Sequence, residues 1–211
     1  KPNNVAGYNM LFNMLSVFPV DKNVIVDISK FSFSEKIALD IEKLPSNVKI
    51  TSLLNDTIEE QDEFSNESFE SWALNCNNEN FKLLITKLTF KTAERISRLR
   101  EIALNFYKFS PVNVKNGTNS EKIEFTYKWC CDNIAYDITA IKSDGSLRWD
   151  RKDSQDPIFT FNRRKGVCEG RARLLKVLLN NYYMRVPCFL VRGKSGNLQH
   201  TWNEAILDDD S

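Results

Sequence analysis

Three stretches in the first half of the chain have the hydrophobic pattern of β-strands. Residues 23–29 alternate between β-branched and polar side chains, and residues 48–54 repeat this pattern less regularly. Residues 81–90 place Phe81, Leu83 and Ile85 on one face of an extended segment. Because β-branched and aromatic side chains at a period of two favour extended backbone, each stretch predicts a strand.

Three helices are expected in the same half. Ser32 and Glu35 have the spacing of a capping box and open a helix that ends at the next proline. The acidic stretch 57–80 lacks long apolar runs, so we expect a loop with a short helix over 69–74. Residues 91–109 predict a long amphipathic helix. Its buried side is expected to hold Ile96, Leu99, Ala103 and Phe106.

The middle of the chain begins with a candidate linker. Residues 111–119 contain a proline, a glycine and three asparagines, a composition typical of connecting segments. Thr118 and Glu121 then form a second capping box, which opens a helix to about Asn133. Its inner face is expected to hold Ile123, Tyr127, Ile134 and one of Cys130 and Cys131. Residues 136–158 predict mostly irregular backbone.

The last part of the chain predicts a helix followed by two strands. The helix starts at Cys168, ends by 185–187, and has an apolar stripe of Ala172, Leu175, Leu179 and Tyr182. Residues 188–192 predict a strand, 193–197 a turn and 199–207 a second strand. Alternation along the second strand places on one face His200, Trp202, Glu204 and Ile206.

Composition excludes several classes of protein. With 42% hydrophobic and 27% charged residues among 211, the chain can bury a sizeable core, so disorder is excluded. The net charge of +1 implies no bulk attraction to nucleic acid or to a membrane surface. The apolar stretch 11–20 is interrupted by polar residues and is too short to span a bilayer.

The numbers of cysteines and histidines argue against disulfide bonds and against a metal site. Five cysteines at irregular spacing do not form a disulfide framework. A single histidine and the absence of a C-x-x-C motif argue against a structural zinc site. We therefore expect neither a metal nor a cofactor.

One cysteine stands out by its position. Cys168 lies in a Gly-Val-Cys-Glu-Gly-Arg-Ala segment at the first turn of a predicted helix, where free backbone N–H groups and the helix dipole favour a thiolate. The only imidazole that could act as a base for this thiol is that of His200, the only histidine in the chain. The structural alternative is a buried, inert thiol, the usual fate of a free cysteine. We predict that Cys130, Cys131 and Cys188 have that structural role.

Together these residues resemble the transglutaminase-like superfamily, and especially its bacterial members. The resemblance rests on Gly-Val-Cys168-Glu-Gly-x-Ala, an apolar helix, a strand, and then His200-x-Trp-Asn-Glu. Upstream, the helix with Trp129 and the Asn-Ile-Ala-Tyr-Asp segment 133–137 match as well. The resemblance covers roughly 120–208.

This resemblance implies a papain-like α+β core in which a helix carrying the nucleophile packs on an antiparallel sheet. It implies that Cys168 is the nucleophile and His200 the base of acyl transfer at carboxamides, without a cofactor. The implied partners are a protein or peptide with a glutamine acyl donor and an amine acceptor. Cross-linking, deamidation and proteolysis all remain open, as does a non-catalytic binding module that kept the fold. A secreted or cell-surface location is favoured over the cytoplasm.

Two departures from the family pattern concern the site itself. Arg171 replaces the aromatic residue usual after Cys-x-Gly. The acid that orients the histidine in the family lies on a strand beyond the last residue, Ser211. Eight extended residues would place Asp208 about 26 Å from His200, so it is expected to belong to a turn. Glu204 is expected at the rim of the site.

Several neighbouring residues have both a functional and a structural interpretation. Trp129 or Trp149 could donate an indole N–H to an oxyanion, but packing is the simpler role for each. Trp202 is expected to pack beside the histidine. The basic run 163–165 could stabilise a thiolate or attract an acidic substrate, and a solvated loop explains it equally well.

The predicted organisation is α+β in two parts. Residues 1–110 form a small α/β region without a chemical motif, 111–119 a linker, and 120–211 a transglutaminase-like core truncated at its C-terminal end. Because the chain begins at Lys1 rather than Met, we expect a fragment of a longer protein.

Overall fold

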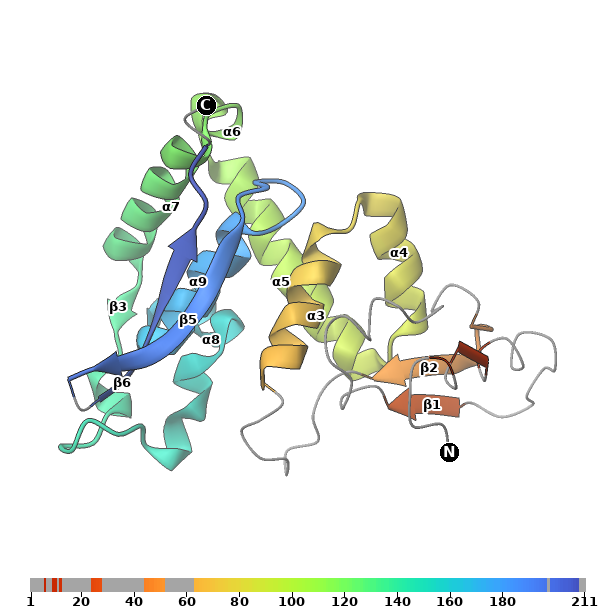
Figure 1. Ribbon diagram of the computed structural model, residues 1–211, viewed down its shortest axis with the longest axis horizontal. Coiled ribbons are helices and arrows are strands. Elements are labelled where there is room, and N and C mark those ends of the chain that lie inside the picture. Colours follow the sequence, from red (N-terminus) through yellow and green to blue (C-terminus); the bar gives the residue numbers. More distant parts are fainter. Residues whose placement is uncertain are drawn as a thin grey trace. The chain divides into compact units, whose positions relative to one another are not determined.

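The computed structural model describes residues 6, 9, 10, 12, 24–27, 44–51, 63–196 and 198–208. The chain divides into two compact units, Lys1–Ser97 and Arg98–Ser211. Helices and small two-stranded sheets are found in the described part of the chain (Figure 1), which confirms the α+β class.

The sheet of the first unit consists of two parallel strands. β1 (Val24–Asp27) pairs with β2 (Val48–Thr51), with Val24 opposite Val48. Both strands fall within stretches predicted to be extended, because their β-branched side chains suit a pleated surface. The helix predicted to open at Ser32 lies outside the described residues.

The predicted strand over 81–90 is wrong, because most of it belongs to helix α4 (Asn78–Lys87). The Asn77 side chain caps this helix by accepting a hydrogen bond from the Asn80 N–H at 2.8 Å. Leu83 of this helix is exposed, whereas Leu84 is buried. The inward-facing positions therefore follow a helical spacing: Phe81, Leu84, Ile85 and Leu88.

Two further helices complete the described part of the first unit. α3 (Glu63–Asn75) is longer than the predicted short helix, and α5 (Phe90–Phe109) matches its prediction. α5 crosses the boundary between the two units. The buried core of the first unit draws on both strands and all three helices: Phe12, Val26, Leu44, Val48, Ile50, Phe69, Ala73, Leu84, Leu88 and Ile96.

The second unit continues with two helices after α5. The predicted linker 111–119 contains the short helix α6 (Val112–Lys115), and Val114 is buried. α7 (Asn119–Asn133) begins with the predicted capping box between Thr118 and Glu121. Its inner face differs from the prediction at one position, because Tyr127 is 60% exposed.

The segment predicted to be mostly irregular contains short elements that lead to the candidate site. They are β3 (Ala135–Tyr136), the 3₁₀ helices η3 (Ile138–Ala140) and η4 (Trp149–Gln155), and α8 (Pro157–Arg163). β3 pairs in parallel with β4 (Lys165–Gly166), which immediately precedes the cysteine segment.

The chain ends with one helix and a hairpin. α9 (Cys168–Leu179) packs against an antiparallel pair, β5 (Cys188–Ser195) and β6 (Leu198–Ala205), as Figure 1 shows. The predicted turn begins too early, since β5 extends to Ser195 and the reversal occurs at Gly196, which has a φ of 62°.

α9 ends earlier than predicted because a buried asparagine caps it. The Asn181 side chain donates to the carbonyls of Val177 and Leu178, both at 2.9 Å. Its side-chain oxygen accepts from the backbone N–H groups of Tyr183 and Met184. These bonds satisfy the backbone groups at the helix end, so the chain can turn toward β5 within the core.

Candidate active site

Cys168 is the first residue of α9, and its side chain is partly buried. The preceding residue, Val167, has extended backbone and donates its N–H to the Ser154 carbonyl at 3.1 Å. The start of α9 is thereby fixed to η4. The thiol lies beside first-turn N–H groups that have no partner within the helix, as the sequence predicts.

Two glycines allow this close approach of α9 to its neighbours. A Cβ on Gly170 would lie 2.2 Å from the Ser154 carbonyl oxygen and 2.5 Å from Thr160 Oγ1. A Cβ on Gly166 would lie 2.5 Å from the same Thr160 atom. The Gly-Val-Cys-Glu-Gly segment therefore needs its glycines for packing around the cysteine.

Tyr136 contacts Cys168 directly. Its hydroxyl hydrogen-bonds with both the backbone N–H and the side chain of Cys168. Burial and the neighbouring Cys168 raise the pKa of Tyr136 above its ordinary value. This role of Tyr136 is not predictable from the sequence, because the contact depends on the pairing of β3 with β4.

Asp137 holds together the elements beneath the cysteine. It is buried, and it accepts hydrogen bonds from Thr139 at 2.6 Å and Ser154 at 2.8 Å. Lys165 lies 3.0 Å from the same carboxylate. Burial alone would raise the pKa of Asp137, but the three partners outweigh that effect and lower it below 3.8.

His200 lies on the solvent-facing side of β6. Its ring stacks on Trp202 with 6.2 Å between the ring centroids, and Glu204 is exposed on the same face. The face that packs on α9 is the opposite one, where Thr201 is buried and Asn203 donates to the Ala172 carbonyl at 2.9 Å. The hairpin thus packs on the cysteine helix through the face without the imidazole.

A hollow of about 360 Å³ lies between the hairpin end and the segment after β3. Its lining is both aliphatic and polar: Tyr136, Ile138, Ile141, Lys142, Gly145, Ser195, Leu198, Gln199 and His200. Tyr136, which hydrogen-bonds with Cys168, therefore shares this hollow with His200.

The hydrogen bond that would join the two predicted catalytic residues is absent from the described part of the chain. Among the residues that the structure describes, no hydrogen bond joins the Cys168 thiol to the His200 ring, and no carboxylate hydrogen-bonds to that ring. Asp208 instead accepts a hydrogen bond from the Ser120 N–H at 3.4 Å. The position of Asp208 agrees with the expectation that it does not orient the histidine.

The tryptophans differ in environment. Trp129 packs edge-on against Phe106, with 5.1 Å between centroids, and stacks on Phe161 at 6.1 Å. The Arg164 guanidinium lies 5.0 Å from the centroid of its ring. Trp149 is 82% exposed. The predicted packing roles are confirmed for Trp129 and, beside His200, for Trp202.

The other basic residues before the cysteine also have partners. Arg163 pairs with Asp153 at 2.7 Å, and Lys165 pairs with Asp137. Arg163 and Arg164 are exposed, as the solvated alternative predicts, but Arg163 ends α8 and Lys165 begins β4, so the segment is not a loop.

The three cysteines for which the sequence predicts a structural role divide into two classes. Cys130 and Cys188 are buried, which confirms their predicted structural role, whereas Cys131 is exposed and does not belong to the core. Burial and the adjacent Cys131 raise the pKa of Cys130 to about 12.

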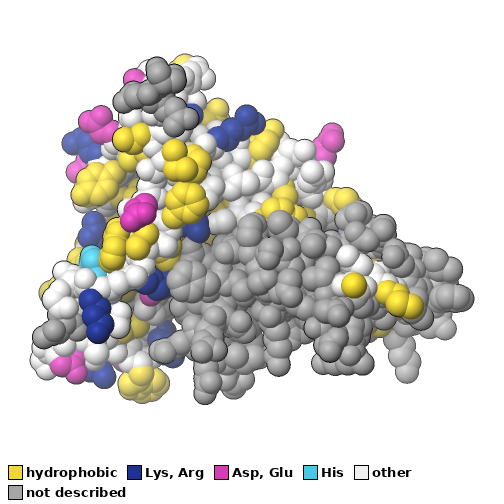
Figure 2. All heavy atoms as spheres, viewed as in Figure 1, with side chains coloured by type: hydrophobic (Ala, Val, Ile, Leu, Met, Phe, Trp, Pro, Cys, Tyr) yellow, Lys and Arg dark blue, Asp and Glu magenta, His cyan; other side chains and the backbone are white. Residues whose placement is uncertain are grey.

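Three further features of the described residues are the distribution of surface charge, the capacity to bind a metal and the capacity to span a membrane. Where Figure 2 colours the described residues, acidic and basic side chains are interspersed. Within the described ranges, no three acidic, cysteine or histidine side chains are placed to hold a metal ion. None of the helices described there has the length and apolar character needed to cross a membrane.

Comparison with known proteins adds no relative: no protein-family model, no curated protein and no solved structure matches this chain.

Proposed function

We propose that this chain carries a transglutaminase-like core that catalyses cysteine-dependent acyl transfer at carboxamides. The observation that carries the proposal is the position of Cys168 at the start of α9, in contact with Tyr136. Tyr136 in turn lines the same hollow as His200, the only histidine in the chain. A hydroxyl that contacts the nucleophile and an imidazole therefore border one solvent-accessible space.

In the proposed first step, the Cys168 thiolate attacks the carbonyl carbon of a carboxamide and forms a C–S bond. First-turn N–H groups of α9 and the Tyr136 hydroxyl stabilise the oxyanion. The C–N bond then breaks, the His200 imidazolium donates to the departing nitrogen the proton that it had taken from the Cys168 thiol, and a thioester remains. In the second step, an amine or water attacks the thioester while His200 accepts its proton, and the C–S bond breaks.

The proposal requires the imidazole to approach Cys168 when a substrate is bound. Catalytic hydrogen bonds are often long or absent in an empty site and tighten when the reacting groups are in place. The hairpin end that carries His200 borders the hollow, so an approach would pass through the space that the substrate occupies.

A protein or peptide glutamine is the proposed acyl donor. With a primary amine as acceptor, the product is an isopeptide cross-link, and with water it is a glutamate. A related amidase or protease would follow the same two steps with a different leaving amine.

The test is an amine-incorporation assay on the protein with a glutamine-containing substrate, with ammonia release measured in parallel. We expect Cys168→Ala to abolish both signals and His200→Ala to reduce both by at least about 100-fold. Cys131→Ser, which removes an exposed thiol, is the control and should retain activity. Full activity of Cys168→Ala would refute the proposal.

A non-catalytic binding module is the second candidate. The observation that favours it is the orientation of β6, whose His200 face does not pack on the cysteine helix. The hollow, with aliphatic walls and Lys142 among its polar residues, would then be the binding site. In that case Cys168→Ala would leave ligand binding unchanged, and no ammonia would be released by any variant.

A further inference from the structure

Glu169, the residue directly after the candidate nucleophile, has an unusual environment. Its side chain is one of the few buried carboxylates among the described residues, with 8% of the residue exposed. It accepts a hydrogen bond from Gln155 at 2.9 Å. Two guanidinium groups also contact it, that of Arg173 at 2.8 Å and that of Arg192 at 2.7 Å.

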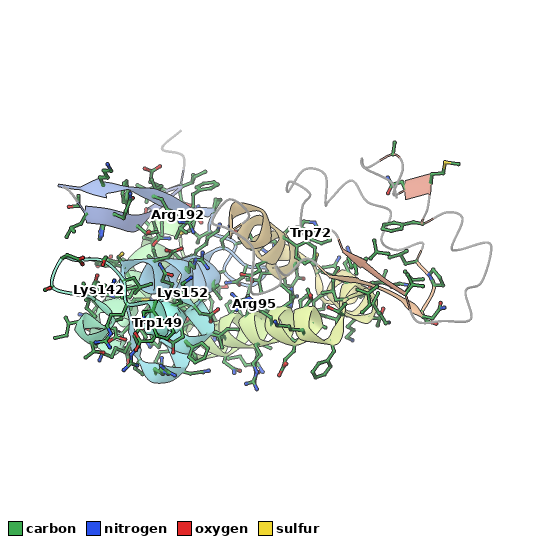
Figure 3. The ribbon with its side chains drawn as sticks, turned by 90° about the horizontal axis from the view of Figure 1, so that it is seen from below. Trp72, Arg95, Lys142, Trp149, Lys152 and Arg192 are labelled. Atoms are coloured by element: carbon green, nitrogen blue, oxygen red, sulfur yellow. The ribbon has the colours of Figure 1, made fainter. Side chains whose placement is uncertain are left out.

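These partners come from three different elements. Arg173 lies one turn further along α9, so its ion pair stays within the helix. Gln155 is the last residue of η4. Arg192 belongs to β5 and reaches the helix from the hairpin, as Figure 3 shows. Among the three partners of Glu169, only Arg192 therefore joins the nucleophile helix to the hairpin, and it does so in addition to the bond from Asn203 to the Ala172 carbonyl.

The register of the hairpin places this contact close to the histidine. Arg192 is opposite Thr201, and the next pair in the ladder is Gly193 with His200. A carboxylate adjacent to Cys168 in the sequence is thus paired with a residue that is diagonal to His200 in the sheet. The distance between the two candidate catalytic residues depends on the position of this strand relative to α9.

A buried ion pair is not explained by stability alone. Removing charges from water offsets most of their attraction, and apolar residues of similar size often stabilise a fold equally well. The geometry of an arginine–carboxylate pair is, however, more specific than apolar packing, because both groups are planar and directional. Such a pair can hold two elements at a defined separation.

We infer that Glu169 is a positioning residue, which through Arg192 holds the hairpin on α9 and thereby limits how far the imidazole of His200 must move to reach Cys168. This inference rests on the proposed function. It assigns Glu169 and Arg192 no contact with the substrate.

The test compares two arginine variants. Arg192→Met removes the contact through which Glu169 joins the helix to the hairpin, whereas Arg173→Met removes one guanidinium from the same carboxylate but leaves that contact intact. The readout is the rate at which chloroacetamide modifies Cys168, measured by peptide mass mapping. His200→Ala defines the part of that rate that depends on the imidazole.

We expect His200→Ala to lower the modification rate of Cys168, and Arg192→Met to lower it by about tenfold, close to the His200→Ala rate. Arg173→Met should stay within about twofold of the unaltered protein. Arg192→Lys retains the charge and should recover part of the loss. Equal rates in Arg192→Met and Arg173→Met would overturn the inference while leaving the Cys–His pair intact.

Two controls separate positioning from unfolding and from failure of the proposed function. Modification of the buried Cys188 would report that Arg192→Met opens the core. In that case the modification rates of Cys168 are compared between Arg192→Lys and Arg173→Lys instead. The rate is again expected to be lower in the Arg192 variant than in the Arg173 variant. A His200→Ala rate equal to that of the unaltered protein would overturn the proposed function itself, and the inference with it.

Discussion

At the scale of single residues, Asp137 determines much of the local order beneath the cysteine. It belongs to the turn after β3, and its partners Ser154 and Lys165 lie in η4 and β4. Its backbone N–H also donates to the Gly166 carbonyl at 3.0 Å. Because Gly166 is two residues before Cys168, the charge of Asp137 supports the start of α9 indirectly.

Asp137 should therefore make stability depend on pH. Its folded-state pKa is lowered, so its contribution is fully present above the unfolded value of 3.8 and is lost as the pH falls toward the folded value. Asp137→Asn should lower the free energy of unfolding at pH 7 by about 2 kcal/mol. The difference from the unaltered protein should shrink below about pH 4.

Urea unfolding at pH 7, 4 and 3 measures this dependence. Asp150→Asn is the matched control, because Asp150 pairs with Arg148 on the surface and its replacement should have little effect. A difference between Asp137→Asn and the unaltered protein that stays constant with pH would contradict the assignment.

The adjacent residues Cys130 and Cys131 give a second prediction at this scale. Burial raises the pKa of Cys130 to about 12, whereas Cys131 is exposed. Iodoacetamide at pH 8 should modify Cys131 within minutes and leave Cys130 unmodified in the folded protein. Peptide mass mapping distinguishes the two, and equal modification would show that α7 is buried through a different face.

Which residues bear the chemistry was only partly predictable from the sequence. Cys168 and His200 could be singled out, because a cysteine at a helix start and a single histidine are local features. The contacts of Tyr136 and Glu169 could not be predicted, since they depend on strand pairing and on a side chain from β5. Non-local contacts of this kind leave no periodic signal.

At the scale of elements, the position of α9 depends on the glycines that flank the cysteine. Gly166 and Gly170 let β4 and the first turn of α9 approach Ser154 and Thr160 more closely than any side chain would allow. This approach presents Cys168 at the end of a helix that is otherwise buried along one side. The Gly-Val-Cys-Glu-Gly segment therefore has a structural role in packing in addition to its candidate catalytic role.

Gly170→Ala should consequently destabilise the fold by about 3 kcal/mol, because the Ser154 carbonyl belongs to the backbone and cannot move aside. Gly196→Ala is the matched control. No atom lies within 4 Å of its Cβ position, so only its φ of 62° opposes the substitution, at a cost of about 1 kcal/mol. Urea unfolding compares the two, and equal losses would contradict the packing argument.

Predictions of elements succeeded where the pattern was long or had a capping signal. The boundaries of α5 and α7 follow from 3.6-residue periodicity and from the Thr118 capping box. Residues 81–90 were mistaken for a strand because a short apolar run fits both periods. The Asn77 cap was the local signal that would have favoured a helix.

At the scale of the whole molecule, α5 links the two compact units. Within the second unit, Phe106 packs on Phe125 and Trp129 of α7, at 5.9 and 5.1 Å between centroids. Tyr107 stacks on Tyr183 at 5.7 Å. The C-terminal part of α5 therefore belongs to the core of the unit that carries the candidate site.

Fragments of the chain test this organisation. A fragment of residues 90–211 should unfold cooperatively, whereas a fragment of residues 111–211 should not, because it lacks the aromatic side chains of α5. Loss of one buried phenylalanine costs about 3–5 kcal/mol, which is comparable to the stability of a small domain. Thermal unfolding followed by circular dichroism compares them, and equally cooperative transitions would place the boundary after 110.

The central claim is that Cys168 and His200 serve one reaction centre, and the single histidine makes this directly measurable. In a Cys131→Ser background, NMR spectra of the His200 ring protons are compared before and after complete chloroacetamide modification of Cys168. Modification should shift both ring signals, and the same treatment of a Cys168→Ala, Cys131→Ser protein should not. Ring signals that stay unchanged after modification of Cys168 would contradict the account.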